Sequence, residues 1–98
     1  MNTIKLDRDE GKVFLKADSE GLLIVSSGGW SVPIDPEIAN NYIKNYDRND
    51  NHKNNINYGF YSTDSGVTLT HGGAKIAFTN AEFDVIESFI ETAERELW

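Results

Sequence analysis

An α+β fold, built from antiparallel β-meanders and two helices, is predicted for this chain of 98 residues by three features of its sequence. Short apolar and β-branched runs alternate with tight turns in both halves of the chain. An Asp-Pro step precedes a stretch with helical spacing in the middle. A long amphipathic stretch with an N-terminal cap comes last. The expected order is βββ(β)-α-βββ-α, in one domain that spans residues 1–98.

The first meander is predicted from runs separated by turns. Residues 3–7 and 12–17 flank the turn DRDEG, and the turn DSEG leads into residues 22–27. This third run begins with four successive apolar residues, which favours a central strand covered on both faces. Residues 30–34 predict a short edge strand, because Pro33 has no backbone N–H to donate to a neighbouring strand.

The middle helix is predicted to run from Asp35 to about Tyr46. The Asp35 carboxylate is expected to cap free backbone amides, and the fixed φ of Pro36 suits the first helical position. A polar, asparagine-rich segment follows over residues 47–57. It is expected to form a loop, because asparagine favours turns and local hydrogen bonds over helix.

The second meander is predicted over residues 58–63, 67–71 and 74–79, which are separated by the turn sequences DSG and GG. The final helix is marked by a capping box, in which Thr79 is followed three residues later by Glu82. Apolar residues then recur along one side of the helix for about five turns. This helix is the clearest element of the sequence.

The core is expected to form from the apolar side of each element. Trp30 follows two glycines and is expected to be buried with its indole N–H hydrogen-bonded. Burial of Trp98 depends on whether the end of the final helix docks. The other expected core residues are Leu23, Val25, Ile38, Tyr42, Phe60, Leu69, Ile76, Phe83, Ile86, Phe89 and Ile90.

The asparagine-rich segment partly matches a calcium-binding loop. Asp47, Asn49 and Asn51 stand at the first, third and fifth positions of that pattern. The required glycine is replaced by His52, however, and the required glutamate by Tyr58. Calcium binding is therefore not expected. Two interpretations of the segment stay open, a solvated connection and a loop that contacts a partner. The possible contact residues are Asp47, Asn49, Asp50 and His52.

The sequence has no catalytic signature. Without cysteine there is no disulfide, thiolate ligand or thiol nucleophile. The two histidines, His52 and His71, lack zinc-ligand spacing, and no serine stands in a G-x-S-x-G elbow. His71 precedes two glycines and is expected at the surface of a turn. We expect no enzyme activity, no cofactor and no metal.

Negative charge is concentrated at the end of the sequence. Residues 64–98 carry seven acids and two bases, and so hold −5 of the formal net charge of −7. This balance argues against direct nucleic-acid binding and favours a basic protein or nucleoprotein partner. No run of apolar residues is long enough for a membrane span or a signal peptide, so a cytoplasmic monomer or small homo-oligomer is expected. The expected partner-binding residues, opposite the apolar side of the final helix, are Asp84, Glu87, Glu91, Glu94 and Glu96.

The last forty or so residues, with a hairpin followed by KIAFTNAEFDVIESFIETAEREL, are similar in layout and charge to some phage-encoded anti-CRISPR proteins that act as DNA mimics. The resemblance implies a non-enzymatic inhibitor whose carboxylates occupy a DNA-binding channel of a nuclease complex. The expected function is thus inhibition of a basic, nucleic-acid-handling complex, of the anti-CRISPR or another anti-defence type. The alternatives are an immunity or antitoxin-like protein that binds a basic toxin, and a phage structural or assembly protein.

Overall fold

The computed structural model describes residues 3–8, 11–46 and 58–98, so the asparagine-rich segment 47–57 lies outside the described residues. The predicted α+β fold and the predicted order of its elements are confirmed. In chain order, the elements are β1 (Thr3–Arg8), β2 (Gly11–Asp18), β3 (Gly21–Ser26), β4 (Ser31–Ile34), α1 (Pro36–Lys44), β5 (Gly59–Thr63), β6 (Gly66–His71), β7 (Ala74–Phe78) and α2 (Asn80–Glu96).

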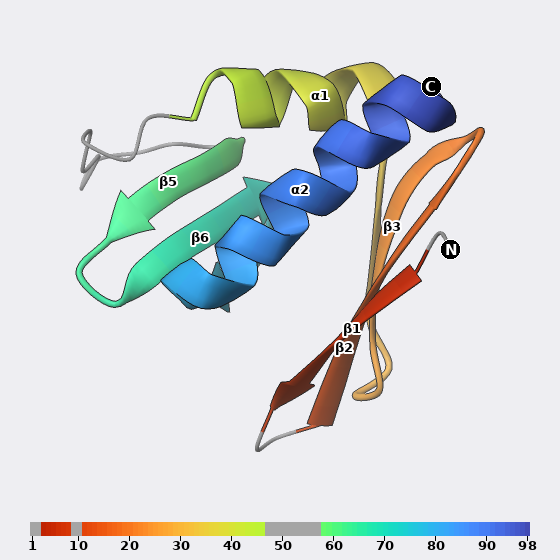
Figure 1. Ribbon diagram of the computed structural model, residues 1–98. Helices are drawn as coiled ribbons and strands as arrows, with labels where there is room; N and C mark the ends of the chain where they lie inside the picture. Colours follow the sequence, from red (N-terminus) through yellow and green to blue (C-terminus); the bar gives the residue numbers. More distant parts are fainter. Residues whose placement is uncertain (1–2, 9–10, 47–57) are drawn as a thin grey trace.

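The strands form two antiparallel sheets in simple sequence order. Strands β1 to β4 make a four-stranded sheet, in which β4 is an edge strand as predicted, and β5 to β7 make a three-stranded sheet. In Figure 1 the two sheets stand apart at their outer ends, with α2 crossing between them and α1 lying along one end. Helix α2 packs on β2 and β6, and α1 packs on β3, β5 and α2. The helices therefore join the sheets.

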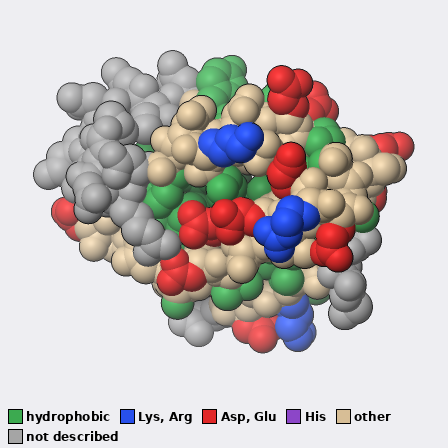
Figure 2. Space-filling model, turned by 45° about the horizontal axis from the view of Figure 1, so that its top comes forward, with side chains coloured by type: hydrophobic (Ala, Val, Ile, Leu, Met, Phe, Trp, Pro, Cys, Tyr) green, Lys and Arg blue, Asp and Glu red, His purple; other side chains and the backbone are tan. Residues whose placement is uncertain are grey.

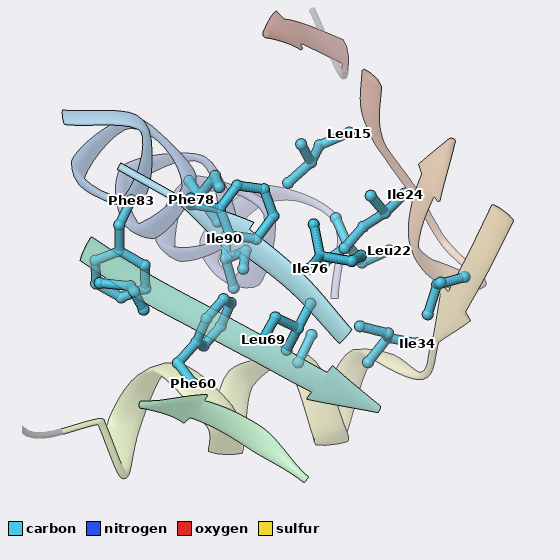
Figure 3. Close-up of a cluster of buried hydrophobic side chains, with 14 of the residues drawn as sticks. Leu15, Leu22, Ile24, Ile34, Phe60, Leu69, Ile76, Phe78, Phe83 and Ile90 are labelled. Atoms are coloured by element: carbon cyan, nitrogen blue, oxygen red, sulfur yellow. The ribbon is translucent and has the colours of Figure 1, made fainter. Parts of the chain in front are cut away.

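One hydrophobic cluster lies between the two sheets and α2. The four-stranded sheet contributes Leu15 and Ile24, the three-stranded sheet contributes Leu69, and α2 contributes Phe83 and Ile90 (Figure 3). These five side chains are at most 1% exposed. Burial of such residues stabilises the fold in proportion to the apolar area removed from water.

The face of β3 that enters the core was predicted wrongly. Leu23 and Val25 are only partly buried, whereas Leu22 and Ile24 are 2% and 1% exposed. A two-residue turn pairs Asp18 with Gly21, so Leu22 lies opposite Ala17 and Ile24 opposite Leu15. Directly opposed residues share a face of the sheet, which fixes the side chains of β3 that enter the core. The other face of β3 is not covered by any helix within the described residues.

The remaining core predictions are confirmed except for Trp30. Trp30 is 41% exposed, because it lies in the β3–β4 turn, where its carbonyl accepts a hydrogen bond of 2.9 Å from the amide of Ser26. Trp98 does dock, and its indole Nε1 donates to the carbonyl of Asp18 at 2.7 Å. Buried, as predicted, are Phe60, Leu69, Ile76, Phe83, Ile86 and Ile90, while Ile38, Tyr42 and Phe89 are partly buried against the cluster.

The two helices begin differently. Pro36 opens α1 as predicted, but the side chain of Asp35 makes no capping hydrogen bond. At α2 the predicted capping box is present: the Glu82 amide donates to Thr79 Oγ1 at 3.1 Å, and the Thr79 amide donates to Glu82 Oε1 at 2.9 Å. Two backbone amides that have no partner inside the helix are thereby satisfied.

Replacing Thr79 by alanine should lower the free energy of unfolding by about 1 kcal/mol, because one capped amide loses its acceptor. Urea unfolding, followed by circular dichroism, measures this loss. Thr79→Ser keeps the hydroxyl and should lose less than half as much. An alanine variant as stable as the wild type would show that the cap does not stabilise α2.

Candidate functional site

The acids of α2 do not all share one side of the helix. At about 100° per residue, Asp84, Glu87, Glu91 and Glu94 fall within a sector of about 80°. Glu96 falls about 120° or more away from all of them. We call the first four residues the acidic row. Helix geometry therefore divides the five acids that were expected to bind a partner into the acidic row and Glu96, which lies on another side of α2.

Burial differs along the acidic row. Asp84 and Glu91 are exposed, whereas Glu87 and Glu94 are partly buried. The expectation that the whole set faces solvent is therefore wrong for Glu87 and Glu94. Around the helix axis, Glu94 and Glu87 are the two members of the row that lie closest to the buried residues of α2.

A cavity separates the N-terminal turn of α1 from the last turns of α2. It is lined by Pro36, Glu37, Asn40, Glu94 and Trp98. The Oε2 atom of Glu94 is buried there without a hydrogen-bond donor from the described residues. The close approach of the two helices thus draws one acid of the row inward.

The face formed by α1 and α2 is predominantly, but not purely, negative. Figure 2 shows acidic side chains gathered beside hydrophobic ones on this face, with basic side chains among them. Lys44, in the last turn of α1, and Arg95 of α2 are both exposed. A partner that docks here would meet mostly carboxylates, together with a few ammonium or guanidinium groups.

Glu82 links the start of α2 to the first strand. Its Oε1 accepts from Arg8 Nη2 at 2.9 Å as well as from the Thr79 amide. The Arg8 guanidinium also lies over the Phe78 ring, 5.2 Å from its centroid. The Arg8 and Glu82 side chains are 29% and 19% exposed. This pair therefore joins the four-stranded sheet to α2 and to the last strand, and has a structural role.

Glu82→Ala should lower the free energy of unfolding by about 2 kcal/mol, because it removes half of the capping box and leaves Arg8 without its carboxylate. Glu82→Gln keeps a side chain that can still cap the Thr79 amide and should lose clearly less. Urea unfolding at low and high salt separates the two contributions. If both variants lose the same unfolding free energy, the whole effect comes from the charge of Glu82.

Two tyrosines, Tyr42 of α1 and Tyr46 just after the end of α1, contact the three-stranded sheet. The Tyr42 hydroxyl lies 2.7 Å from His71 Nδ1, and the Tyr46 hydroxyl lies 2.8 Å from Ser62 Oγ. Tyr58, 62% exposed, makes an edge contact with His71 at 6.1 Å. His71 is thus partly buried, not a free surface residue of a turn as expected. No short sequence pattern indicates this pairing, since its partners are 29 residues apart.

Burial, and secondly the nearby Tyr58, raises the pKa of the Tyr42 hydroxyl. Tyrosine in an unfolded chain ionises near pH 10. The folded state therefore holds this proton more tightly, and the resulting stability is present below about pH 10 and lost as the pH rises through the folded pKa. Tyr42→Phe should flatten the fall in unfolding free energy above pH 10. Urea unfolding between pH 8 and 11 tests this, and a variant that keeps the wild-type slope would contradict it.

The described residues show no other assembled site. Within residues 3–8, 11–46 and 58–98, no three His, Asp or Glu side chains group closely enough to hold a metal ion. Neither helix in this part of the chain is long and apolar enough to cross a membrane. The possible contact residues Asp47, Asn49, Asp50 and His52 lie outside the described residues.

Comparison with models of known protein families, with curated proteins and with solved structures gives no match to this chain.

Proposed function

We propose that the protein is a small acidic inhibitor that binds a basic, nucleic-acid-handling complex through the acidic row of α2, in the manner of an anti-CRISPR or other anti-defence protein. The observation that carries this proposal is the acidic row itself. Asp84 and Glu91 are exposed and stand two helical turns apart on one side of α2. Lysine and arginine side chains of a partner fit such a surface.

Neighbouring acids of the row repel one another, and Arg95, four residues after Glu91, offsets part of this repulsion. The members of the row follow one another at spacings of three or four residues, where like charges repel by a few tenths of a kcal/mol per pair. Glu94 also lies near the negative end of the helix dipole, where a base is favoured. A binding role accounts for this arrangement, because a basic partner would neutralise the row.

The spacing of the row supports partial mimicry of DNA. The four acids span about 15 Å over residues 84–94, or roughly one acid per 5 Å of helix axis, and the two exposed acids, Asp84 and Glu91, are about 10 Å apart. One strand of duplex DNA carries a phosphate about every 3.4 Å along its axis. The row is thus less densely charged than a DNA strand, but its charges are arranged along one line, as the phosphates of a strand are. The row would therefore occupy only part of a DNA-binding channel.

An immunity or antitoxin-like protein would use the same acidic row, but its partner would be a basic toxin.

A structural or assembly role is favoured by a different observation, the uncovered face of the four-stranded sheet. There, Phe14, Leu23 and Val25 are only partly buried and Pro33 is exposed. Such a patch supports self-association through apolar contacts.

The proposal is tested by adding the purified protein to a panel of CRISPR nuclease complexes and measuring DNA cleavage. We expect cleavage by one complex to fall with increasing protein, and binding to that complex to weaken as salt rises or as competing duplex DNA is added. Inhibition that is unaffected by DNA would exclude mimicry. If no complex is inhibited and a basic toxin is bound instead, the immunity-type role replaces the proposal.

A further inference from the structure

The cavity between α1 and α2 has both apolar and polar walls. It lies where the C-terminal end of α2 meets the first turn of α1 (Figure 1). Apolar surface comes from Pro36 and the Trp98 ring, and polar groups come from Glu37, Asn40 and Glu94. The volume of this interhelical cavity is about 280 Å³, whereas pockets that hold drug-sized ligands measure roughly 300–1,000 Å³. The interhelical cavity is therefore suited to one side chain or to a molecule of that size.

The indole ring of Trp98 is fixed in the wall of the interhelical cavity. Its Nε1 donates to the carbonyl of Asp18 at 2.7 Å, and the backbone amide of Trp98 donates to the carbonyl of Ala93 at 3.1 Å. The ring also packs against the hydrophobic cluster. Because the face of an indole ring attracts positive charge, an aromatic wall held in this way suits a cation.

The carboxylates of the interhelical cavity have no base beside them. Glu94 Oε2 is buried without a hydrogen-bond donor from the described residues, and Glu37 adds a second carboxylate from the first turn of α1. None of the described lysines and arginines lines the cavity. Arg95 points about 100° away from Glu94 around α2, and its Nη2 donates to Thr92 Oγ1 at 3.4 Å. A donor for Glu94 is therefore expected from a ligand.

The start of α1 acts against a cation, but more weakly than the two carboxylates attract it. The N-terminus of a helix carries about half a positive charge, whereas Glu37 and Glu94 together carry two negative charges. Glu94 is only partly buried as a whole, so a small group inside the interhelical cavity can approach its carboxylate. The balance of charge in the cavity is therefore negative.

We propose that the interhelical cavity binds an alkylammonium group, such as the end of a lysine side chain of the basic partner. The ammonium group donates a charge-assisted hydrogen bond to Glu94. Its positive charge is attracted by Glu37 and by the indole ring of Trp98. The alkyl chain packs against Pro36, as the long stem of lysine commonly does on apolar surface.

This inference rests on the proposed function for the identity of the partner, and it adds an anchor to that function. Glu94 is the member of the acidic row that lines the interhelical cavity. One lysine of the partner enters the cavity, while other bases of the partner meet the exposed acids Asp84 and Glu91. Because the lysine in the cavity is shielded from water, it contributes more to affinity than the bases at the surface.

Titration of the unaltered protein with n-butylammonium chloride near neutral pH, followed by NMR, tests the interhelical cavity directly. Sodium chloride keeps the ionic strength constant. The indole N–H signal of Trp98 should shift until it saturates, whereas that of Trp30, which lies in the β3–β4 turn, should not move. n-Butanol has the same alkyl chain without the charge and should bind at least about tenfold more weakly.

Glu94→Gln removes the charge but keeps the size of the side chain, and should weaken n-butylammonium binding by about tenfold or more. Glu96→Gln is the matched control, because it removes the same charge from the opposite side of α2, and it should bind as the wild type does. A Trp98 signal that does not saturate, or equal binding of n-butanol, would overturn the proposal. Wild-type affinity in Glu94→Gln would do the same. The titration needs no partner protein, so its failure is distinct from a failure of the proposed function.

Discussion

Phe83→Ala is expected to lower the free energy of unfolding by about 3–5 kcal/mol, through lost burial and the cavity that remains. Phe83 is fully buried. Its ring lies 5.0 Å from the Phe60 ring and 4.5 Å from the Tyr46 ring. The substitution thus loosens α2 from the three-stranded sheet and from the residues that follow α1. Because small domains are stable by only about 5–15 kcal/mol, this loss removes a large part of the total stability.

Urea unfolding followed by tryptophan fluorescence measures this effect, and Phe89→Ala provides the control. Phe89 lies on the same helix and loses the same atoms, but its side chain is only partly buried. Its substitution should lower the unfolding free energy by less than half as much. Equal losses at the two positions would contradict the packing of α2 described above.

Local sequence signals predicted the elements of the fold well. Turn sequences such as DSEG and DSG place the hairpins, and Thr79 with Glu82 places the start of α2. The face of β3 was missed because LLIV is apolar on both faces, so alternation cannot choose between Leu22 and Leu23. Pairing across the turn decides it. Burial of Trp30 was predicted wrongly because this residue lies in the β3–β4 turn, where even a large hydrophobic side chain can remain exposed to solvent.

The candidate site was predictable only in part. The acids of α2 can be found in the sequence, and helical phase alone separates Glu96 from the acidic row. The cavity at Glu94 depends on how α1 approaches α2, which no local pattern encodes. The same holds for Arg8 with Glu82, which are 74 residues apart in sequence. Contacts of this kind arise from tertiary packing and leave no periodic signal.

Asp84→Lys/Glu91→Lys is expected to weaken binding of the basic partner about 100-fold, or about 2.7 kcal/mol, because two attractive contacts become repulsive. Both residues are exposed and outside the hydrophobic cluster, so the fold and its unfolding midpoint should be retained. Most of the loss should disappear in high salt, where exposed charges are screened. A loss that persists unchanged in high salt would indicate altered packing in place of electrostatic repulsion.

The most direct test of the acidic row is a comparison of dissociation constants for that partner between this double variant and Glu20→Lys/Glu96→Lys. Each variant replaces two acids by two lysines, which moves the formal net charge from −7 by four units to −3. Glu20 lies in the β2–β3 turn, and Glu96 lies away from the row on α2. If the acidic row binds the partner, the first variant loses about 100-fold in affinity and the second less than about 3-fold. Equal losses in the two variants would contradict a binding surface on α2 and leave only the net charge of the protein as the cause.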